Sequence, residues 1–286
     1  MSYIDEVEIK ILVENTAQLG MKNILGAHGL AIHLKIIYDD GKITNILFDT
    51  GPSHKVIENN AEEMNVKLKE IDIIVLSHGH YDHTGGLLGV LKSLDRRIPV
   101  IAHPDCFLPK FVLKPKFRYN GIPFSTNEIQ QYANLICLKE PIEISRQVYT
   151  SGEVPRITDF EKISGLKTIR EHKIIDDKML DDQSLIVNFK NGLIIITGCA
   201  HAGVINIIER AIKITGREDI RAVIGGFHLV GAKRERIEKT IEALKSHKIK
   251  EIMPCHCTGE KAIIEMAFKL KDKIKRVSAG NTLIFK

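Results

Sequence analysis

The stretch IDIIVLSHGHYDHTGGL, residues 71–87, decides the interpretation of this sequence. Its first half, IDIIVL, is apolar except for Asp72 and has the length of a strand, which is typical of a strand buried on both faces. Four side chains that bind metals follow directly, because His78, His80, Asp82 and His83 fall within six residues. The stretch therefore predicts a buried strand that ends in a metal-binding turn.

The residue types in this turn indicate which ions it would bind. Alternate side chains of an extended chain point to the same side, so His78 and His80 face one way, whereas Asp82 and His83 lie where the chain enters the next helix. Imidazole and carboxylate together suit Zn²⁺, Mn²⁺ or Fe²⁺. A solvated loop or a helix cap would explain one such residue but not four. We predict that these four residues bind one or two divalent metal ions, most readily Zn²⁺.

Regular elements surround this turn on both sides. Residues 31–51 predict two strands joined by a turn at 39–41. The further predicted elements of the first half are helices at 53–64 and 84–94 and strands at 71–77 and 98–103. The second half repeats the plan, with a hairpin turning at Asn191-Gly192, strands at 221–226 and 248–254, and helices at 203–214, 233–246 and 259–270. This order predicts an α/β fold with two β-layers inside and helices outside.

The 286 residues include 44% apolar and 27% charged residues, which excludes a disordered chain. Five cysteines are too few for a disulfide scaffold of this length, and no apolar run is long enough to span a membrane. The acidic start MSYIDEVEIK is unlike a signal peptide, so we expect a cytoplasmic protein. A formal charge of only +5 gives little support to nucleic-acid binding.

The region 104–180 has weaker patterns and four prolines between 104 and 123. We interpret it as an irregular excursion, and residues 104–126 either form a lid over a pocket or a self-packed surface loop. Because no linker separates the two halves, we expect one domain over 1–286.

Two further histidines follow strands in the second half. His201, in TGCAHAG, lies at a strand-to-helix turn like the first cluster, so we predict it as a third metal site residue. His228, in GGFHL, is interpreted either as a pocket residue that contacts substrate or cofactor or as a core histidine. Cys255 and Cys257 alternate with His256, so we expect both to be packing residues unless the chain turns there.

The segment HGHYDH matches the HxHxDH signature of the metallo-β-lactamase superfamily, and FDTG at 48–51 is similar to its upstream aspartate motif. The resemblance implies an αββα sandwich of two mixed β-sheets flanked by helices. It also implies that Asp49 orients a ligand and that His256, in PCHCTG, is the final metal ligand.

One departure from the superfamily pattern concerns the dipeptide Gly198-Cys199. Many members have Gly-Asp there, and that aspartate bridges two metals. The substitution leaves open whether Asp182 supplies a cofactor-binding carboxylate instead or whether His201 takes over part of the bridging position.

The resemblance implies a hydrolase that uses a metal-activated water, with Asp82 orienting the water or binding a second ion. The narrower pattern of SGEVPR, DDQSL and GGFHL is also similar to archaeal 7,8-dihydropterin-6-methyl-4-(β-D-ribofuranosyl)aminobenzene 5′-phosphate synthases, which are transferases. An iron-dependent redox enzyme and a non-catalytic binding module are further alternatives. We expect a small-molecule, anionic substrate, which in the synthase alternative would contact basic residues among Lys114, Lys116, Arg118 and Arg156.

Overall fold

The structure is a computed structural model that describes residues 3–286. The chain divides into two units. The seven-strand unit comprises residues 5–139, 163–181 and 278–286, and the six-strand unit comprises residues 3–4, 140–162 and 182–277.

The seven-strand unit is built on a mixed sheet with the order β17-β1-β2-β3-β4-β5-β8. Its strands are β1 (Ile4–Val13), β2 (Ala31–Tyr38), β3 (Ile43–Phe48), β4 (Ile73–Val75), β5 (Pro99–Ala102), β8 (Asn134–Cys137) and β17 (Thr282–Phe285). The expected antiparallel pair is confirmed as β2 and β3, and β3, β4, β5 and β8 run parallel. The strand predicted at 71–77 is therefore an interior parallel strand, but it is shorter than predicted and comprises Ile73–Val75.

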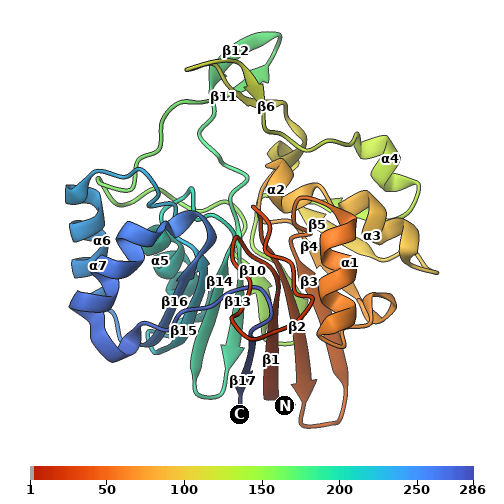
Figure 1. Ribbon diagram of the computed structural model, residues 1–286, viewed down its shortest axis with the longest axis horizontal. Coiled ribbons are helices and arrows are strands. Elements are labelled where there is room, and N and C mark those ends of the chain that lie inside the picture. Colours follow the sequence, from red (N-terminus) through yellow and green to blue (C-terminus); the bar gives the residue numbers. More distant parts are fainter. Residues whose placement is uncertain (1–2) are drawn as a thin grey trace. The chain divides into compact units, whose positions relative to one another are not determined.

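Helices α1 (His54–Glu63) and α3 (Leu87–Ser93) cover this sheet (Figure 1). Ile57 of α1 and Leu91 of α3 belong to one buried cluster with Leu47, Ile74 and Val100 of the strands. The predicted helix at 84–94 is divided, because the single turn α2 (Tyr81–Thr84) precedes α3. The histidine-rich turn thus begins at the carboxyl end of a buried strand, with His78 and His80 between β4 and α2 and with Asp82 and His83 in α2.

The region 104–180 is more regular than the sequence indicated. Its elements are η2 (Pro104–Phe107), β6 (Lys110–Val112), β7 (Arg118–Tyr119), α4 (Thr126–Gln130), β8, β9 (Glu143–Ser145), β10 (Val148–Thr150), β11 (Leu166–Arg170) and β12 (Lys173–Asp176). Strands β12, β11, β6 and β7 form a small antiparallel sheet. The hairpin of β11 and β12 turns at Glu171 and His172, both with positive φ (48° and 60°), which sequence patterns associate with Asn-Gly.

The six-strand unit has the strand order β16-β15-β14-β13-β10-β9. Its further strands are β13 (Ser184–Phe189), β14 (Gly192–Thr197), β15 (Ile220–Gly226) and β16 (Ile249–Cys255). The predicted hairpin is β13 and β14, but Phe189 pairs with Gly192, so the turn residues are Lys190 and Asn191 rather than Asn191 and Gly192. Strands β14, β15 and β16 are parallel, so their carboxyl ends meet at one edge of the sheet.

Helices α5 (Val204–Thr215), α6 (Arg234–Ser246) and α7 (Glu260–Leu270) cover the six-strand sheet (Figure 1). A buried cluster joins Ile208 of α5, Ile241 of α6 and Met266 of α7 to Ile195 and Val223 of the strands. The six-strand unit also contains the short helices η3 (His256–Thr258) and η4 (Lys271–Lys273), and the seven-strand unit contains η1 (Leu68–Glu70). Each predicted helix and strand of the second half is present to within one residue at either end.

Candidate metal centre

The histidine-rich turn of the seven-strand unit is buried. His78 and His83 are fully enclosed, and His80 and Asp82 are each 7% exposed. Gly79 is required for this course of the chain, because a Cβ there would overlap the carbonyl group of Cys106. Close packing therefore requires glycine at position 79, and this packing lets the turn bring its flanking histidines inward.

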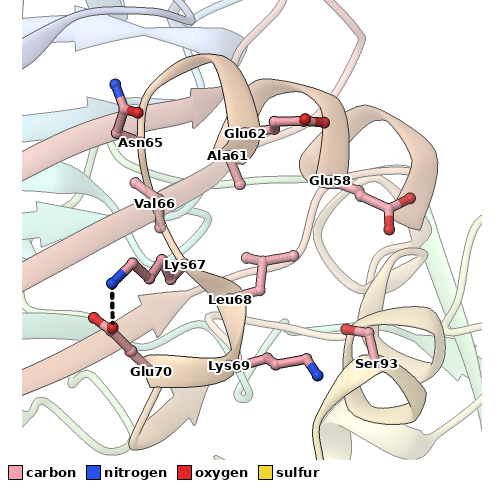
Figure 2. Close-up of a pocket in the computed structure, with 10 residues that line it drawn as sticks. All are labelled: Glu58, Ala61, Glu62, Asn65, Val66, Lys67, Leu68, Lys69, Glu70 and Ser93. Atoms are coloured by element: carbon pink, nitrogen blue, oxygen red, sulfur yellow. Dashed lines mark hydrogen bonds and ion pairs between the residues drawn. The ribbon is translucent and has the colours of Figure 1, made fainter.

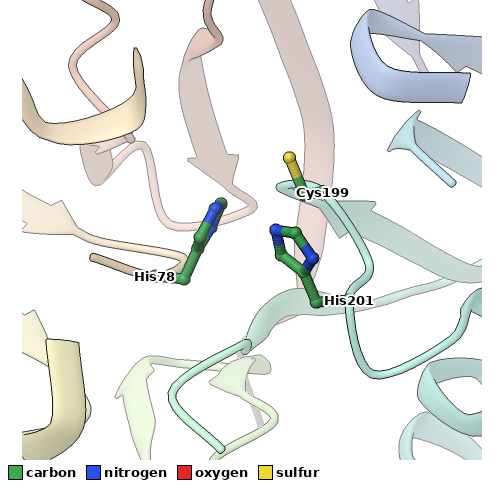
Figure 3. Close-up of side chains that lie close together, drawn as sticks. All are labelled: His78, Cys199 and His201. Atoms are coloured by element: carbon green, nitrogen blue, oxygen red, sulfur yellow. The ribbon is translucent and has the colours of Figure 1, made fainter. Parts of the chain in front are cut away.

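The three imidazole rings of the turn converge. His78 Nε2 lies 2.9 Å from His80 Nδ1, and the His78 ring is 4.2 Å from the His83 ring between centroids. His78 is drawn in Figure 3. Nitrogen atoms this close need to move apart by only about 0.4 Å to reach the roughly 3.3 Å separation of two nitrogen ligands on one tetrahedral ion.

Asp49 holds two of these rings in place. It follows β3 with φ of 61°, and its buried carboxylate accepts hydrogen bonds from the Ser77 backbone N–H at 2.7 Å and the Ser77 hydroxyl at 2.6 Å. His83 Nδ1 lies 2.6 Å from the same carboxylate, and His78 Nδ1 lies 2.8 Å from Ser77 Oγ. With both Nδ1 atoms engaged as donors, the Nε2 atoms of His78 and His83 carry the lone pairs that a metal needs.

Asp82 lies beside the same rings. Its Oδ2 is 3.7 Å from His83 Nε2 and 3.5 Å from Nε2 of the exposed His28. Burial lowers the pKa of His80 to about 3, against the opposing effect of the Asp82 charge. His80 is therefore a neutral imidazole at physiological pH and can donate a lone pair.

A buried ion pair that the sequence analysis missed supports the turn. Lys110 Nζ lies 2.9 Å from Asp181 Oδ1 and 2.8 Å from Asp177 Oδ2. Burial would raise the pKa of Asp181, but the Lys110 charge outweighs it and holds that pKa below its ordinary value. Asp181 Oδ2 accepts the Gly79 backbone N–H, so the ionised carboxylate fixes the centre of the turn.

In the six-strand unit, His201 lies between β14 and α5, in the loop that also carries Cys199 (Figure 3). Asp182 anchors this loop, because its Oδ2 accepts the Ala202 backbone N–H at 2.9 Å. The ring of His201 is 4.1 Å from that of His228, which follows β15. The structure thus brings His201 and His228 together and places Asp182 beside the loop.

His256 begins η3 directly after β16, with φ of 52°. The strand therefore ends there and the chain turns. Cys257 no longer has to point away from His256, as it would in a continuous strand. Although burial alone would raise its pKa, the Cys257 thiol has a pKa well below its ordinary value because of its hydrogen bonds with Cys199 and His228 and the nearby His256. Cys257 thus becomes a candidate ligand that the sequence analysis set aside.

The donor chemistry fits a divalent metal in this part of the chain. His78, His80, His83 and Asp82 offer neutral nitrogen and anionic oxygen, the donor types of zinc, manganese and iron sites. By contrast, the pocket of about 500 Å³ beside α1 is lined by Glu58, Glu62 and Lys67 with neighbouring residues (Figure 2). It contains none of the expected site residues and is not the candidate centre.

The fold and this donor set define a metallo-β-lactamase-type protein. The sequence matches the metallo-beta-lactamase superfamily over residues 37–255, and the chain belongs to that superfamily. It is 35% identical to the 7,8-dihydropterin-6-methyl-4-(beta-D-ribofuranosyl)-aminobenzene-5′-phosphate synthase of Methanocaldococcus jannaschii, over 99% of this chain and 98% of that protein. It is 37% identical to an uncharacterised protein of the same organism, over 91% of this chain and 93% of that protein.

Among solved structures, the chain resembles one described as a metal-dependent hydrolase of the beta-lactamase superfamily. The TM-score is 0.81 at 30% identity, over 97% of this chain and 98% of that one. The expected α/β fold class, with two mixed sheets and flanking helices, is confirmed. Every helix within residues 3–286 is too short or too polar to cross a bilayer.

Proposed function

We propose that this chain is a metal-dependent enzyme whose metal is held by His78, His80 and His83, with Asp82 as the catalytic carboxylate. The convergence of the three buried rings carries this proposal, since His78 Nε2 lies 2.9 Å from His80 Nδ1. When bound, a divalent ion there supplies a Lewis acid that acidifies water and polarises a substrate oxygen. His201 and His256 of the six-strand unit are proposed as further ligands from their positions after β14 and β16.

The chain's own residues prepare the site for this chemistry. Asp49 and Ser77 fix the tautomers of His83 and His78 and hold both rings still. Asp82 is buried, with 7% of its surface exposed, and we assign it the role of orienting a nucleophilic water and accepting its proton. Because these groups are enclosed before substrate arrives, little reorganisation is needed for reaction.

Hydrolysis of a small, anionic ester, lactone or phosphodiester is the first candidate reaction. It is supported by the similar structure described as a metal-dependent hydrolase. The test is turnover of a panel of such substrates by wild type, Asp82→Asn and the exposed control Asp40→Asn. We expect turnover by wild type and control and a loss of at least about 100-fold in Asp82→Asn, the usual contribution of a general base.

The synthase reaction is the second candidate, favoured by the full-length similarity to the archaeal synthase. In that reaction the aromatic amine nitrogen would displace pyrophosphate from a pterin-methyl carbon, so that a carbon–nitrogen bond forms, the carbon–oxygen bond to pyrophosphate breaks and the amine loses a proton. Exposed Lys114, Lys116 and Arg118 of the seven-strand unit and Arg156 of the six-strand unit are candidates for binding the phosphates. Pyrophosphate release from the paired substrates, without turnover of the hydrolase panel, would select this candidate and reject the first.

We also propose that the site prefers zinc over manganese or iron and that the substrate is anionic. A cytoplasmic location and one functional domain over 1–286 are further proposals. We propose that Asp182 and His228 bind the cofactor or substrate. We also propose that residues 104–126 form a lid. An optical signature of bound iron would favour the alternative of an iron-dependent redox enzyme.

A further inference from the structure

Three loops of the six-strand unit meet at one edge of its sheet. Cys199 follows β14, His228 follows β15 and Cys257 lies in η3 after β16. Because the three strands are parallel and adjacent, their carboxyl ends lie side by side, with Thr197 paired to Gly225 and Gly225 paired to Pro254. The topology therefore gathers two thiols and an imidazole from segments that are distant in sequence.

The three side chains approach closely enough to share an ion. The sulfur atoms of Cys199 and Cys257 and one ring nitrogen of His228 all lie within 4.8 Å of one another. Zinc ligands at about 2.3 Å for sulfur and about 2.0 Å for nitrogen would be roughly 3.5–4 Å apart in a tetrahedral site.

The backbone is shaped to admit the Cys257 thiol. A Cβ on Gly226 would lie 2.7 Å from Cys257 Sγ, so only glycine leaves the space that the sulfur occupies. His228 has φ of 46°, which is uncommon for a residue other than glycine. Strain of this kind persists where neighbouring structure enforces it.

Hydrogen bonds fix the loops that carry Cys257 and His228 against each other. The Cys257 carbonyl oxygen accepts the backbone N–H groups of Leu229 at 3.1 Å and Val230 at 3.0 Å. The Phe227 N–H donates to Thr258 Oγ1 at 3.0 Å, and that hydroxyl donates to the Cys255 carbonyl at 2.7 Å. The positions of His228 and Cys257 are thus set by main-chain geometry as well as by side-chain packing.

The donor atoms have the chemistry of a soft site. Cys199 is 4% and Cys257 9% exposed, and Nδ1 of His228 is buried without a hydrogen bond to residues 3–286. We propose that Cys199, His228 and Cys257 bind a soft divalent cation of the Zn²⁺ class through two thiolate sulfurs and one imidazole nitrogen. Binding releases to solvent any proton that the two sulfur atoms still carry, and a water or substrate atom completes the coordination.

This site is different in chemistry from the oxygen- and nitrogen-based donor set of the histidine turn. It also gives Cys199 a function where many superfamily members carry an aspartate. The proposal goes beyond the proposed enzymatic function, because it concerns ligands that lie wholly within the six-strand unit.

The test is titration of the metal-free, reduced full-length protein with Co²⁺, following the near-ultraviolet charge-transfer absorption that thiolate ligation produces. We expect the band in wild type and its loss or a shift to lower intensity in Cys257→Ser and in Cys199→Ser. Cys255→Ser is the matched control, because Cys255 is also buried and flanks His256 on the other side. Circular dichroism and thermal unfolding establish that each variant is folded.

A second readout is protection of the thiols from alkylation by Zn²⁺. Zn²⁺ is expected to slow modification of Cys199 and Cys257 at least tenfold and to leave the exposed Cys137 unchanged. The His78→Ala variant should keep the charge-transfer band, which separates failure of this proposal from failure of the proposed function. Absence of the band in wild type, or full intensity in Cys257→Ser, would overturn the proposal.

Discussion

Asp181 accepts a hydrogen bond from the backbone N–H of Gly79 at 2.8 Å, although the two residues are 102 positions apart in sequence. The other oxygen of the same carboxylate pairs with Lys110, which is itself buried. A long-range ion pair therefore fixes the middle of the histidine turn, between His78 and His80. The distance between these ligands depends on residues that never need to touch a metal.

Replacing Lys110 by methionine should destabilise the protein strongly. The change leaves Asp177 and Asp181 buried without their cation, and breaking a buried pair in this way typically costs about 3–5 kcal/mol. Denaturant unfolding measures the loss. Lys69→Met is the control, because the Lys69–Asp95 pair is exposed and its removal should leave the unfolding free energy nearly unchanged. Equal effects of the two substitutions would contradict the assigned role of Lys110.

Asp49→Asn should weaken metal binding without abolishing it. Asparagine keeps an acceptor for Ser77 but loses the charge that holds the His83 ring and its tautomer. Loss of such an orienting carboxylate usually lowers metal affinity roughly 10–100-fold. Competition with a coloured chelator measures the affinity, and Asp40→Asn on an exposed turn is the control. An unchanged affinity in Asp49→Asn would remove Asp49 from the site.

His33 should make stability depend on pH. Burial lowers its pKa from 6.5 to about 4, against the opposing effect of its hydrogen bond with Asn45. The unfolded chain therefore gains a proton near pH 6.5 while the folded chain resists until about pH 4, so stability present above pH 6.5 is lost as pH falls through this window. At about 1.4 kcal/mol per pKa unit, the His33 contribution is about 3 kcal/mol.

The variant His33→Gln isolates that contribution. Glutamine retains a donor for Asn45 but does not titrate, so the stability difference between variant and wild type should shift in favour of the variant as the pH falls from 7 to 4.5. Unfolding in urea at both pH values measures it. Parallel pH dependence of the two proteins would show that His33 does not titrate as the structure requires.

Gly79→Ala should disrupt the turn. The added Cβ meets the Cys106 carbonyl, which is main chain and has little freedom to move, so a loss of about 1–3 kcal/mol accompanies reduced metal content. Gly41→Ala is the comparison. Gly41 has φ of 79° and open space, so alanine there costs about 1–2 kcal/mol of backbone strain and leaves metal content intact. Full metal content in Gly79→Ala would contradict this packing argument.

The sequence predicted what is local. The ligands of the turn at 78–83 are contiguous, and the strand before them and the helices after them have clear apolar patterns, so both position and chemistry could be inferred. Lys110 could not be recognised, because its partner Asp181 is 71 residues away and a buried lysine has no local signature. Their pairing depends on tertiary structure alone.

Turn conformations account for other differences. The hairpin at 166–176 uses Glu171 and His172 with positive φ, so the Asn-Gly signature of such turns is missing. Cys257 leaves the strand because His256 adopts φ of 52°, a conformation that no propensity rule assigns to histidine in this context. In both places surrounding structure imposes a backbone geometry that the residue type alone disfavours.

Metal content per chain is the most direct test of the central claim, the metal-binding role of the histidine turn. Elemental analysis would compare wild type, purified without chelators or added metals, with His78→Ala and with His172→Ala, an exposed control on the β11–β12 turn. We predict at least one divalent ion per wild-type and control chain and a clear loss in His78→Ala. Wild-type protein that contains no metal, even after reconstitution with Zn²⁺, Mn²⁺ and Fe²⁺, would contradict the account.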